Sequence, residues 1–387
     1  MSSRRAFLRS AAFGAAALAG APAVLRQRFQ LFAGSPAEYS ARTIRLMQEA
    51  LVIDGLAPWS LDFAKQSRWL TQPETFTQAD VQPYLDSGIH VWHHAVGFGG
   101  PNAYEQGVSY MGGWNSFLAG NDQRLMRIDS AADFERVRGS GKVGIMLGVQ
   151  NADHFRRPDD VEFFWGLGQR ISQLTYNSRN WIGSGATERR DDGISDFGAA
   201  IIARMNTVGM AVDTGHCGDR TTLDAFELSK VPVLVTHSNV RALNPGHPRC
   251  KPDEVIRAVG KAGSVMGITG VRNFVKNSEP TTVEDYLNQF DYVKRMIGAE
   301  CLGVGSDIDL YGYDAMPPEA YKRLKGSYKD SYAFRDKIDI EGIDHPKRMF
   351  DVTEGLIRRK YTDAEILGIL GGNFRRVLTE IWKGLPA

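Results

Sequence analysis

Short apolar runs alternate with stretches of helical periodicity from about residue 40 onward, and this alternation restricts the fold of the 387-residue chain more than any other feature. The runs are rich in Val, Ile and Leu and apolar without interruption, which is typical of strands buried on both faces of a parallel sheet. Eight strands are expected, over 51–53, 89–92, 143–149, 171–176, 210–212, 231–235, 264–268 and 302–304. Amphipathic helices are expected over 196–208, 223–228, 252–262 and 283–297. Eight strand–helix units predict a single α/β domain, a closed (β/α)8 barrel of the TIM type with loop insertions.

Three segments depart from this alternation. Residues 104–121 are rich in Gly and aromatic side chains, and we expect them to form an insertion after the second strand. Residues 309–337 carry many Tyr, Lys and Pro residues and follow the eighth strand, where a long loop would act as a lid over the barrel mouth. Residues 362–382 are expected to be helical.

The first residues are typical of an export signal that is removed from the mature protein. Arg4 and Arg5 form a twin-arginine pattern, an apolar run follows, and Ala21-Pro22-Ala23 matches an A-x-A cleavage site. We therefore expect the mature protein in the periplasm or secreted. The expected division of the chain is a cleaved twin-arginine signal over 1–23, a linker with a helix over 24–45, and the barrel over 46–387.

The charge balance and the cysteine content exclude several classes of protein. Lys and Arg total 46 and Asp and Glu total 45, so no excess of positive charge indicates binding to nucleic acid. After the N-terminal segment, no apolar stretch reaches the roughly 20 residues that span a bilayer. The three cysteines form no C-x-x-C motif. We therefore expect the partner of the site to be a small molecule.

Polar side chains follow most of the expected strands, at the end where a parallel barrel gathers its functional groups. His216 and His237 occupy the same position after successive strands, with a helix-length segment between them. Because neutral imidazole is a good zinc ligand, the pair indicates a shared metal site, although a catalytic zinc normally has three protein ligands. The residues just past the eight strands are Asp54, His94, Gln150, Asn177, His216, His237, Thr269 and Asp307.

Further residues are candidates for roles at the mouth. Gln150 could add a neutral oxygen to the two imidazoles. Asp307 is the acidic side chain there and could ligate a metal, act as a general base or hold a substrate ammonium. Arg249 follows the sixth strand, where a guanidinium suits a substrate carboxylate; a surface salt bridge explains it equally well. His93 and His94 are consecutive in a strand, so at most one of them can point into the barrel.

The motifs around these residues resemble those of the membrane dipeptidase (renal dipeptidase) family of metallopeptidases, a branch of the amidohydrolase-like barrels. The resemblance implies a (β/α)8 fold, a two-zinc site, hydrolysis of dipeptides and a homodimer. The matches run in order over nearly all of the mature chain: Leu174-Thr175-Tyr176-Asn177, Gly183-x-Gly185-x-x-Glu188, Ser195-Asp196-Phe197-Gly198, Val212-Asp213-x-x-His216, His237-Ser238-Asn239, His247-Pro248-Arg249, Gly305-Ser306-Asp307 and Gly371-Gly372-Asn373-Phe374.

Part of the family's active site carries over to this chain. The resemblance makes His216 and His237 ligands of one zinc. It makes Arg249 the residue that binds the substrate carboxylate, and Asp307 the mouth aspartate that serves substrate and catalysis.

The remaining family positions are occupied by different residues. Leu56 and Pro58 replace the first-strand His-x-Asp pair, Gln150 replaces the bridging glutamate, and the fourth-strand histidine falls at Asn177. Two neighbouring dications repel and need bridging negative charge, which no carboxylate supplies here. The sequence therefore predicts at most one divalent metal, on the two histidines and Gln150, or none. Gln150 and Asn177 are then candidates for substrate binding.

Three functions follow from these observations. The first is a periplasmic hydrolase of dipeptides or related small amides that uses at most one divalent metal such as zinc. The second is a metal-independent lyase or isomerase in which His216 or His237 titrates near neutrality as acid and base. The third is a non-catalytic protein that binds a ligand in the same pocket. We take the first as the prediction.

Overall fold

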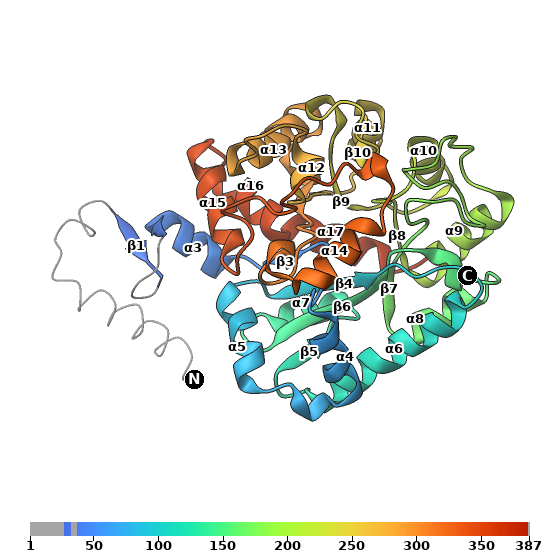
Figure 1. Cartoon of the computed structure of the whole chain (residues 1–387), viewed down its shortest axis with the longest axis horizontal. Helices are drawn as coiled ribbons and strands as arrows, with labels where there is room; N and C mark the ends of the chain where they lie inside the picture. The colour runs from blue at the N-terminus through green and yellow to red at the C-terminus, as the bar shows by residue number, and fades with distance from the viewer. Residues whose placement is uncertain (1–26, 32–36, 386–387) are drawn as a thin grey trace.

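Eight parallel strands surround a common axis in the computed structural model, which describes residues 27–31 and 37–385 (Figure 1). One sheet holds β3, β4, β6, β7 and β8 in that order, and the other holds β9, β11 and β12. The two sheets meet at both seams. A parallel bridge pairs Asp213 with Leu234, and the Gly55 amide donates to the Val304 carbonyl at 2.7 Å. The eight strands are β3 (Ile53–Asp54), β4 (Val91–Val96), β6 (Val143–Val149), β7 (Gln169–Gln173), β8 (Ala211–Asp213), β9 (Val235–Val240), β11 (Met266–Ile268) and β12 (Leu302–Val304).

Four short strands lie outside this ring of eight. β1 (Arg28–Gln30) and β2 (Glu38–Ser40) form a separate antiparallel pair. β5 (Leu125–Arg127) pairs with the first residues of β6, and β10 (Cys250–Lys251) pairs with the end of β9.

Helices enclose the strands, and local sequence signals explain where several of them begin and end. The Ser195 hydroxyl accepts from the Gly198 amide at the start of α9, and Gly209 ends that helix in a left-handed conformation (φ 83°). Thr282 and Asp285 form a capping box at the start of α13. The α-helices are α3 (Ala41–Glu49), α4 (Phe63–Thr71), α5 (Gln78–Ser87), α6 (Ala103–Gly120), α7 (Ala131–Val137), α8 (Asp160–Gly166), α9 (Asp196–Val208), α10 (Asp219–Leu228), α11 (Asp253–Lys261), α12 (Arg272–Val275), α13 (Val283–Ile297), α14 (Pro318–Gly326), α15 (Arg348–Arg358), α16 (Asp363–Leu367) and α17 (Asn373–Ile381).

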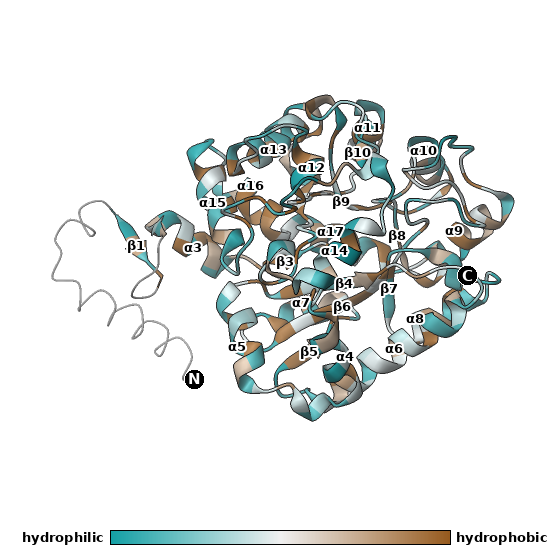
Figure 2. Cartoon of the chain, viewed as in Figure 1, coloured by the Kyte–Doolittle hydropathy of each residue, from teal (hydrophilic) through white to brown (hydrophobic). Residues whose placement is uncertain are grey.

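The apolar core lies between the strands and the helices around them. Every residue of β6 is buried, as expected for a strand covered on both faces. In Figure 2, hydrophobic residues gather near the central strands, whereas α10 and the loops beside it are mainly hydrophilic. The chain is therefore a single α/β domain with a (β/α)8 barrel, as predicted.

The sequence pattern located most elements correctly. The helices expected over 196–208 and 283–297 match α9 and α13, and all eight predicted strand regions contain or adjoin a barrel strand. β9 is shifted toward the C-terminus and begins only at Val235. Residues 104–121, expected as an insertion after the second strand, form the helix α6 after β4. Its buried residues recur every three or four positions, a helical spacing that the Gly-rich composition concealed.

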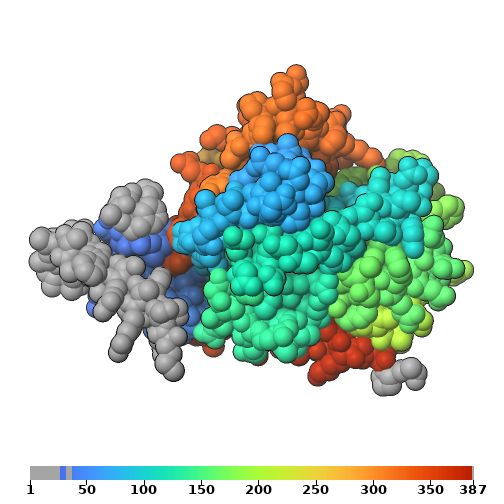
Figure 3. Space-filling view, turned by 90° about the horizontal axis from the view of Figure 1, so that it is seen from below, coloured from blue at the N-terminus to red at the C-terminus, as the bar shows by residue number. Residues whose placement is uncertain are grey.

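The segment expected as a lid has structure of its own. Between β12 and α15 it contains α14 and two short 3-10 turns, η5 (Tyr313–Ala315) and η6 (Asp330–Tyr332). In Figure 3 this orange part of the chain stands out from the surface beside the blue segment that carries α4. The long loop predicted over 309–337 is thus partly helical.

Two expectations concern the N-terminal part of the chain. The twin-arginine pattern and the cleavage site lie outside the described residues. The expected boundary at residue 45 falls inside α3, so the division of the chain into linker and barrel stays a prediction. Within the described part of the chain, no helix combines the length and the apolar character needed to cross a bilayer.

Candidate active site

His216 and His237 lie side by side, His216 three residues after β8 and His237 within β9 instead of just past its strand as predicted. Their ring centroids are 4.9 Å apart, and both side chains are buried. His216 Nδ1 lies 2.7 Å from the Asn177 Oδ1 atom. Because an amide oxygen only accepts, Nδ1 carries the proton and Nε2 keeps its lone pair.

A three-residue hydrogen-bond chain gives His237 the same tautomer. The Thr236 hydroxyl donates to Asp213 Oδ2 at 2.7 Å and lies 2.8 Å from His237 Nδ1. With its proton committed to Asp213, the hydroxyl accepts from Nδ1–H, and Nε2 of His237 keeps its lone pair. This Nε2 atom is buried and has no hydrogen-bond partner among the described residues. Both imidazoles therefore have the form in which histidine binds a metal.

The surroundings of the two histidines favour their neutral state. Burial is the main cause that holds the pKa of each well below its usual range, and the positive charge of Arg249 acts in the same direction. Lys251, buried nearby, adds to this effect. Neither ring therefore titrates near neutrality, which differs from what the metal-independent acid–base hypothesis requires.

Gln150 is linked to His216 through Gln173 and has one side-chain oxygen without a hydrogen bond. Its Nε2 donates to the Ala95 carbonyl at 3.1 Å, while its buried Oε1 has no partner in the described part of the chain. Gln173 connects the two groups, since it donates to the Gln150 carbonyl at 2.8 Å and accepts from the His216 amide at 3.0 Å. The predicted third donor is thus positioned by its neighbours and left without a hydrogen bond.

Asp307 follows β12 and has an unusual backbone conformation. Its φ of 57° is in the left-handed region, where a residue other than glycine is strained. Its amide donates to the Leu56 carbonyl at 2.9 Å. Among the described residues, no donor or cation forms a hydrogen bond or ion pair with its carboxylate. Burial raises the pKa of Asp307 to about 7; Arg249 opposes this rise and Asp54 adds to it.

Arg249 is fully buried behind the mouth. Its Nε donates to the Tyr332 hydroxyl at 3.1 Å and its Nη1 donates to the Gly215 carbonyl. Nη2 is buried without a partner among the described residues. The structure therefore excludes the surface salt bridge that its position in the sequence also allowed. It leaves one donor of a fixed positive charge without a hydrogen bond.

The cavity above these residues has aromatic walls, and we call it the aromatic pocket. Its volume is about 310 Å³, and Gln150 and Asp307 lie on its floor. The aromatic residues that line it are Phe63, Tyr176, Phe274, Tyr313, Tyr328, Tyr332 and Phe334. Four of these seven rings belong to the lid segment, which confirms that residues after β12 cover the mouth.

Tyr176 separates this pocket from the histidines, and sequence reasoning missed it. Its ring stacks on His216 with centroids 4.1 Å apart and an interplanar angle of 20°. Its hydroxyl lies 2.7 Å from that of Tyr328 in the lid. The neighbouring Asn177 was predicted to bind substrate, but its Oδ1 is bonded to His216 Nδ1. At the end of an apolar run, Tyr176 carried no signal that distinguished it from a core residue.

The two consecutive histidines of β4 point to opposite faces, as expected. The Nδ1 atom of His93 lies 2.6 Å from the Gly55 carbonyl oxygen. Its Nε2 atom packs against Gly148, where a Cβ atom would lie 2.2 Å from Nε2. His94 packs against Trp114 of α6 instead, with ring centroids 4.5 Å apart. Only His93 is therefore on the side of β4 that faces the barrel.

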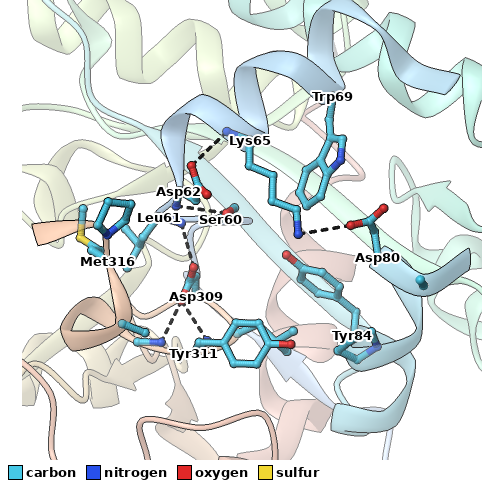
Figure 4. Close-up of a pocket in the computed structure, with 16 residues that line it drawn as sticks. Ser60, Leu61, Asp62, Lys65, Trp69, Asp80, Tyr84, Asp309, Tyr311 and Met316 are labelled. Carbon is cyan, nitrogen blue, oxygen red and sulfur yellow. Dashed lines mark hydrogen bonds and ion pairs between the residues drawn. The ribbon is translucent and has the colours of Figure 1, made fainter. Parts of the chain in front are cut away.

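A second pocket of about 310 Å³ lies between α4, α5 and the start of the lid segment (Figure 4). Its acidic groups are already engaged. Asp309 accepts from the amides of Leu61, Tyr311 and Gly312 at 2.8–2.9 Å, and Lys65 pairs with Asp80 at 3.2 Å (Figure 4). We therefore place the active site in the aromatic pocket and the groups beneath it.

The number of side-chain atoms that can bind a metal limits how many metal ions this site can hold. In the described part of the chain, no three His, Cys, Asp or Glu side chains are arranged to hold a metal ion. Leu56 and Pro58 offer no ligand atoms in their side chains. The structure therefore does not fit a two-metal centre. The lone-pair nitrogens of His216 and His237 are two donors of the kind that zinc prefers, one fewer than the three protein ligands that a catalytic zinc normally has.

A barrel that gathers these groups at the carboxyl ends of its strands is an enzyme of the (β/α)8 class. The sequence matches the membrane dipeptidase family (peptidase family M19) over residues 40–324, and the chain belongs to that family. It is therefore a hydrolase of the dipeptidase family, as predicted.

Solved structures agree with this assignment. An amidohydrolase from Pseudomonas aeruginosa is 28% identical, with a TM-score of 0.74 over 88% of this chain and 99% of that one. The probable dipeptidase PvdM from Pseudomonas aeruginosa is 18% identical, with a TM-score of 0.72 over 88% of this chain and 98% of that one. A metallopeptidase from Rhodobacter sphaeroides, liganded with a phosphinate mimic of the dipeptide L-Ala-D-Ala, is 16% identical, with a TM-score of 0.69 over 86% and 99%. The latter two show a shared fold.

Proposed function

We propose that this protein hydrolyses a dipeptide or a related small amide with at most one divalent metal ion. The observation that carries the proposal is the pair of buried imidazoles, His216 and His237, each with Nδ1 committed to a hydrogen bond and Nε2 left as a lone pair. The solved metallopeptidase with a bound dipeptide mimic supports the substrate class. The loss of carboxylates at the other family positions supports the limit of one ion.

His216, His237 and Gln150 would hold the ion. When bound there, a divalent metal polarises the scissile carbonyl and lowers the pKa of a water molecule. Asn177 and Thr236 would not contact the metal, but their hydrogen bonds keep the two imidazoles in the metal-binding tautomer.

Arg249 and Asp307 would handle the charges of the substrate. The unpartnered Nη2 of Arg249 is available for a substrate carboxylate, and a buried guanidinium binds that group strongly. Asp307 has a carboxylate with no internal partner and a pKa of about 7, so near neutrality it can accept a proton from water and return one to the leaving amine. The Tyr332 hydroxyl on Arg249 Nε fixes the direction of the guanidinium.

We also propose that the protein is exported by the twin-arginine route and acts in the periplasm or outside the cell. The Arg4-Arg5 pattern, the apolar run and the A-x-A site support this location. The twin-arginine route carries folded proteins, which agrees with a metal loaded before export. A dimer in solution, expected from the family resemblance, stays a prediction.

Elemental analysis of the purified protein tests the metal, and a screen of dipeptides tests the reaction. We expect about one zinc or other divalent ion per chain, together with hydrolysis of at least one dipeptide or small amide. The His216→Ala and His237→Ala variants should lose both. His345→Ala is the matched control, because this histidine lies at the surface beside Asp351 and should keep both.

Each alternative result contradicts a stated part of the proposal. Two ions per chain would show that ligands other than these residues complete the site. A protein that binds no ion even after incubation with zinc would refute the metal mechanism. Full activity in His237→Ala would refute the role of that imidazole.

A further inference from the structure

The aromatic pocket has a wall chemistry that is unusual for a site that receives a charged substrate. Seven aromatic residues line it, and its only charged lining residue in the described part of the chain is Asp307. The lining residues include no Lys, Arg or His there. The electrostatic potential in the pocket is therefore set by one carboxylate and by the faces of aromatic rings, which carry partial negative charge.

The rings form a connected wall instead of isolated contacts. Tyr332 lies at the centre, with ring centroids 4.5 Å from Tyr328, 5.1 Å from Phe334 and 5.2 Å from Phe274. Tyr332 is fixed further by Arg249, which donates to its hydroxyl. A wall held in this way keeps its shape when the pocket is empty, so little ordering cost is paid when a ligand binds.

The floor carries the acceptors that a cation needs. The carboxylate of Asp307 has no hydrogen bond or ion pair to any described residue, although burial in the pocket makes an unpaired charge costly. An unpartnered carboxylate at an aromatic cavity is complementary to a positively charged group and not to an anion.

We propose that the aromatic pocket binds an organic ammonium group that carries apolar substituents, with the cation facing Asp307 and its substituents against the rings. A cation over an aromatic face gains roughly 0.5–2 kcal/mol, and an alkylated ammonium loses less hydration on entry than an inorganic ion of the same charge. The nearest buried cation, Arg249, lies behind Tyr332 and not among the lining residues, so it does not occupy the place of the ligand.

This inference rests on the proposed function in one respect: it takes the ammonium group to be the part of the substrate that the lid contacts. Under that function, Arg249 Nη2 receives an anionic end and the aromatic pocket a cationic, apolar end. Binding in the pocket does not require bond cleavage. It can therefore be measured separately from hydrolysis.

The test is titration calorimetry of the full-length purified protein with choline and with 3,3-dimethylbutan-1-ol, which has the same shape without the charge. We choose pH 8, above the pKa of about 7 of Asp307, so that its carboxylate is ionised. We expect choline to bind at least about tenfold more tightly than the neutral alcohol. Equal affinity for the two, or no binding of choline, would overturn the proposal.

Two variants separate the contributions of charge and aromatic wall. Asp307→Asn should remove most of the preference for choline, and Phe334→Leu should weaken choline by about fivefold with a smaller effect on the alcohol. Asp330→Asn, at an exposed position of the same lid segment, is the control and should bind choline as the unaltered protein does. Unchanged choline affinity in Asp307→Asn would overturn the assignment of that carboxylate.

The comparison of the two ligands on the unaltered protein does not depend on whether these variants fold. A protein that hydrolyses dipeptides but shows no preference for choline would refute this inference alone. A protein that prefers choline but cleaves no amide would refute only the proposed function.

Discussion

Replacing Asp307 with asparagine is expected to change how the stability of the protein depends on pH. In the folded protein, burial raises the pKa of this carboxyl from 3.8 to about 7. Between these two values the folded state keeps the proton and the unfolded chain releases it. The stabilising contribution of the proton is therefore complete below about pH 4 and is lost as the pH rises to about 7. Asparagine does not titrate, so the variant lacks this dependence.

The size of the effect follows from the two pKa values. Each pKa unit corresponds to about 1.4 kcal/mol, which sets an upper limit of about 4 kcal/mol for a shift from 3.8 to about 7. Asp307 keeps some exposure to the aromatic pocket, and solvent screening there reduces the figure. We therefore expect the stability of Asp307→Asn relative to the unaltered protein to rise by about 2–4 kcal/mol between pH 4 and pH 8.

Urea unfolding at several values of pH between 4 and 8 measures this difference. All other titrating groups are shared by the two proteins, so their contributions cancel in the comparison. Any constant offset from the substitution itself also drops out, because only the dependence on pH is used. A difference that stays flat from pH 4 to pH 8 would refute the reasoning, since it would show that the carboxylate is not desolvated in the folded state.

The remaining predictions concern catalysis and metal binding. If the ionised Asp307 is the general base, kcat/KM should rise about tenfold per pH unit below its pKa of about 7 and level off above it; a profile that is flat from pH 5 to pH 8 would contradict this role. Thr236→Val removes the hydroxyl between Asp213 and His237, so zinc affinity should fall by about 10- to 100-fold in a competition titration with a chelator. Thr207→Val, on the solvent side of α9, is the matched control; equal zinc affinity in both variants would show that the hydroxyl does not orient the imidazole.

The fold could be predicted from the sequence because strands buried on both faces are apolar without interruption. Segments of helical periodicity separate these strands along the chain, as a (β/α)8 barrel requires. The same logic failed where composition concealed periodicity. Residues 104–121 were expected only as an insertion and not as a helix, yet Met111, Trp114 and Phe117 are buried in α6 at helical spacing. The left-handed conformation of Asp307 had no local signal either, although aspartate adopts it more often than most residues other than glycine.

The candidate site was predictable only at positions where the residue type itself indicates metal binding or acid–base chemistry. His216, His237 and Asp307 follow apolar runs and were singled out for that reason. Tyr176 was not, because its role comes from a stack on His216 and a hydroxyl contact with Tyr328, which lies 152 residues further along the chain. Contacts between residues so far apart leave no pattern that a single sequence can show.

The division of the site between two parts of the chain has a consequence for how such an enzyme can change. The groups that would bind metal and move protons lie on barrel strands or just after them. Four of the seven rings of the aromatic pocket lie within residues 313–334, on a lid that adds no strand to the barrel. Mutations that accumulate in this lid can redirect the enzyme to a new ligand while the barrel and its reaction chemistry are inherited intact.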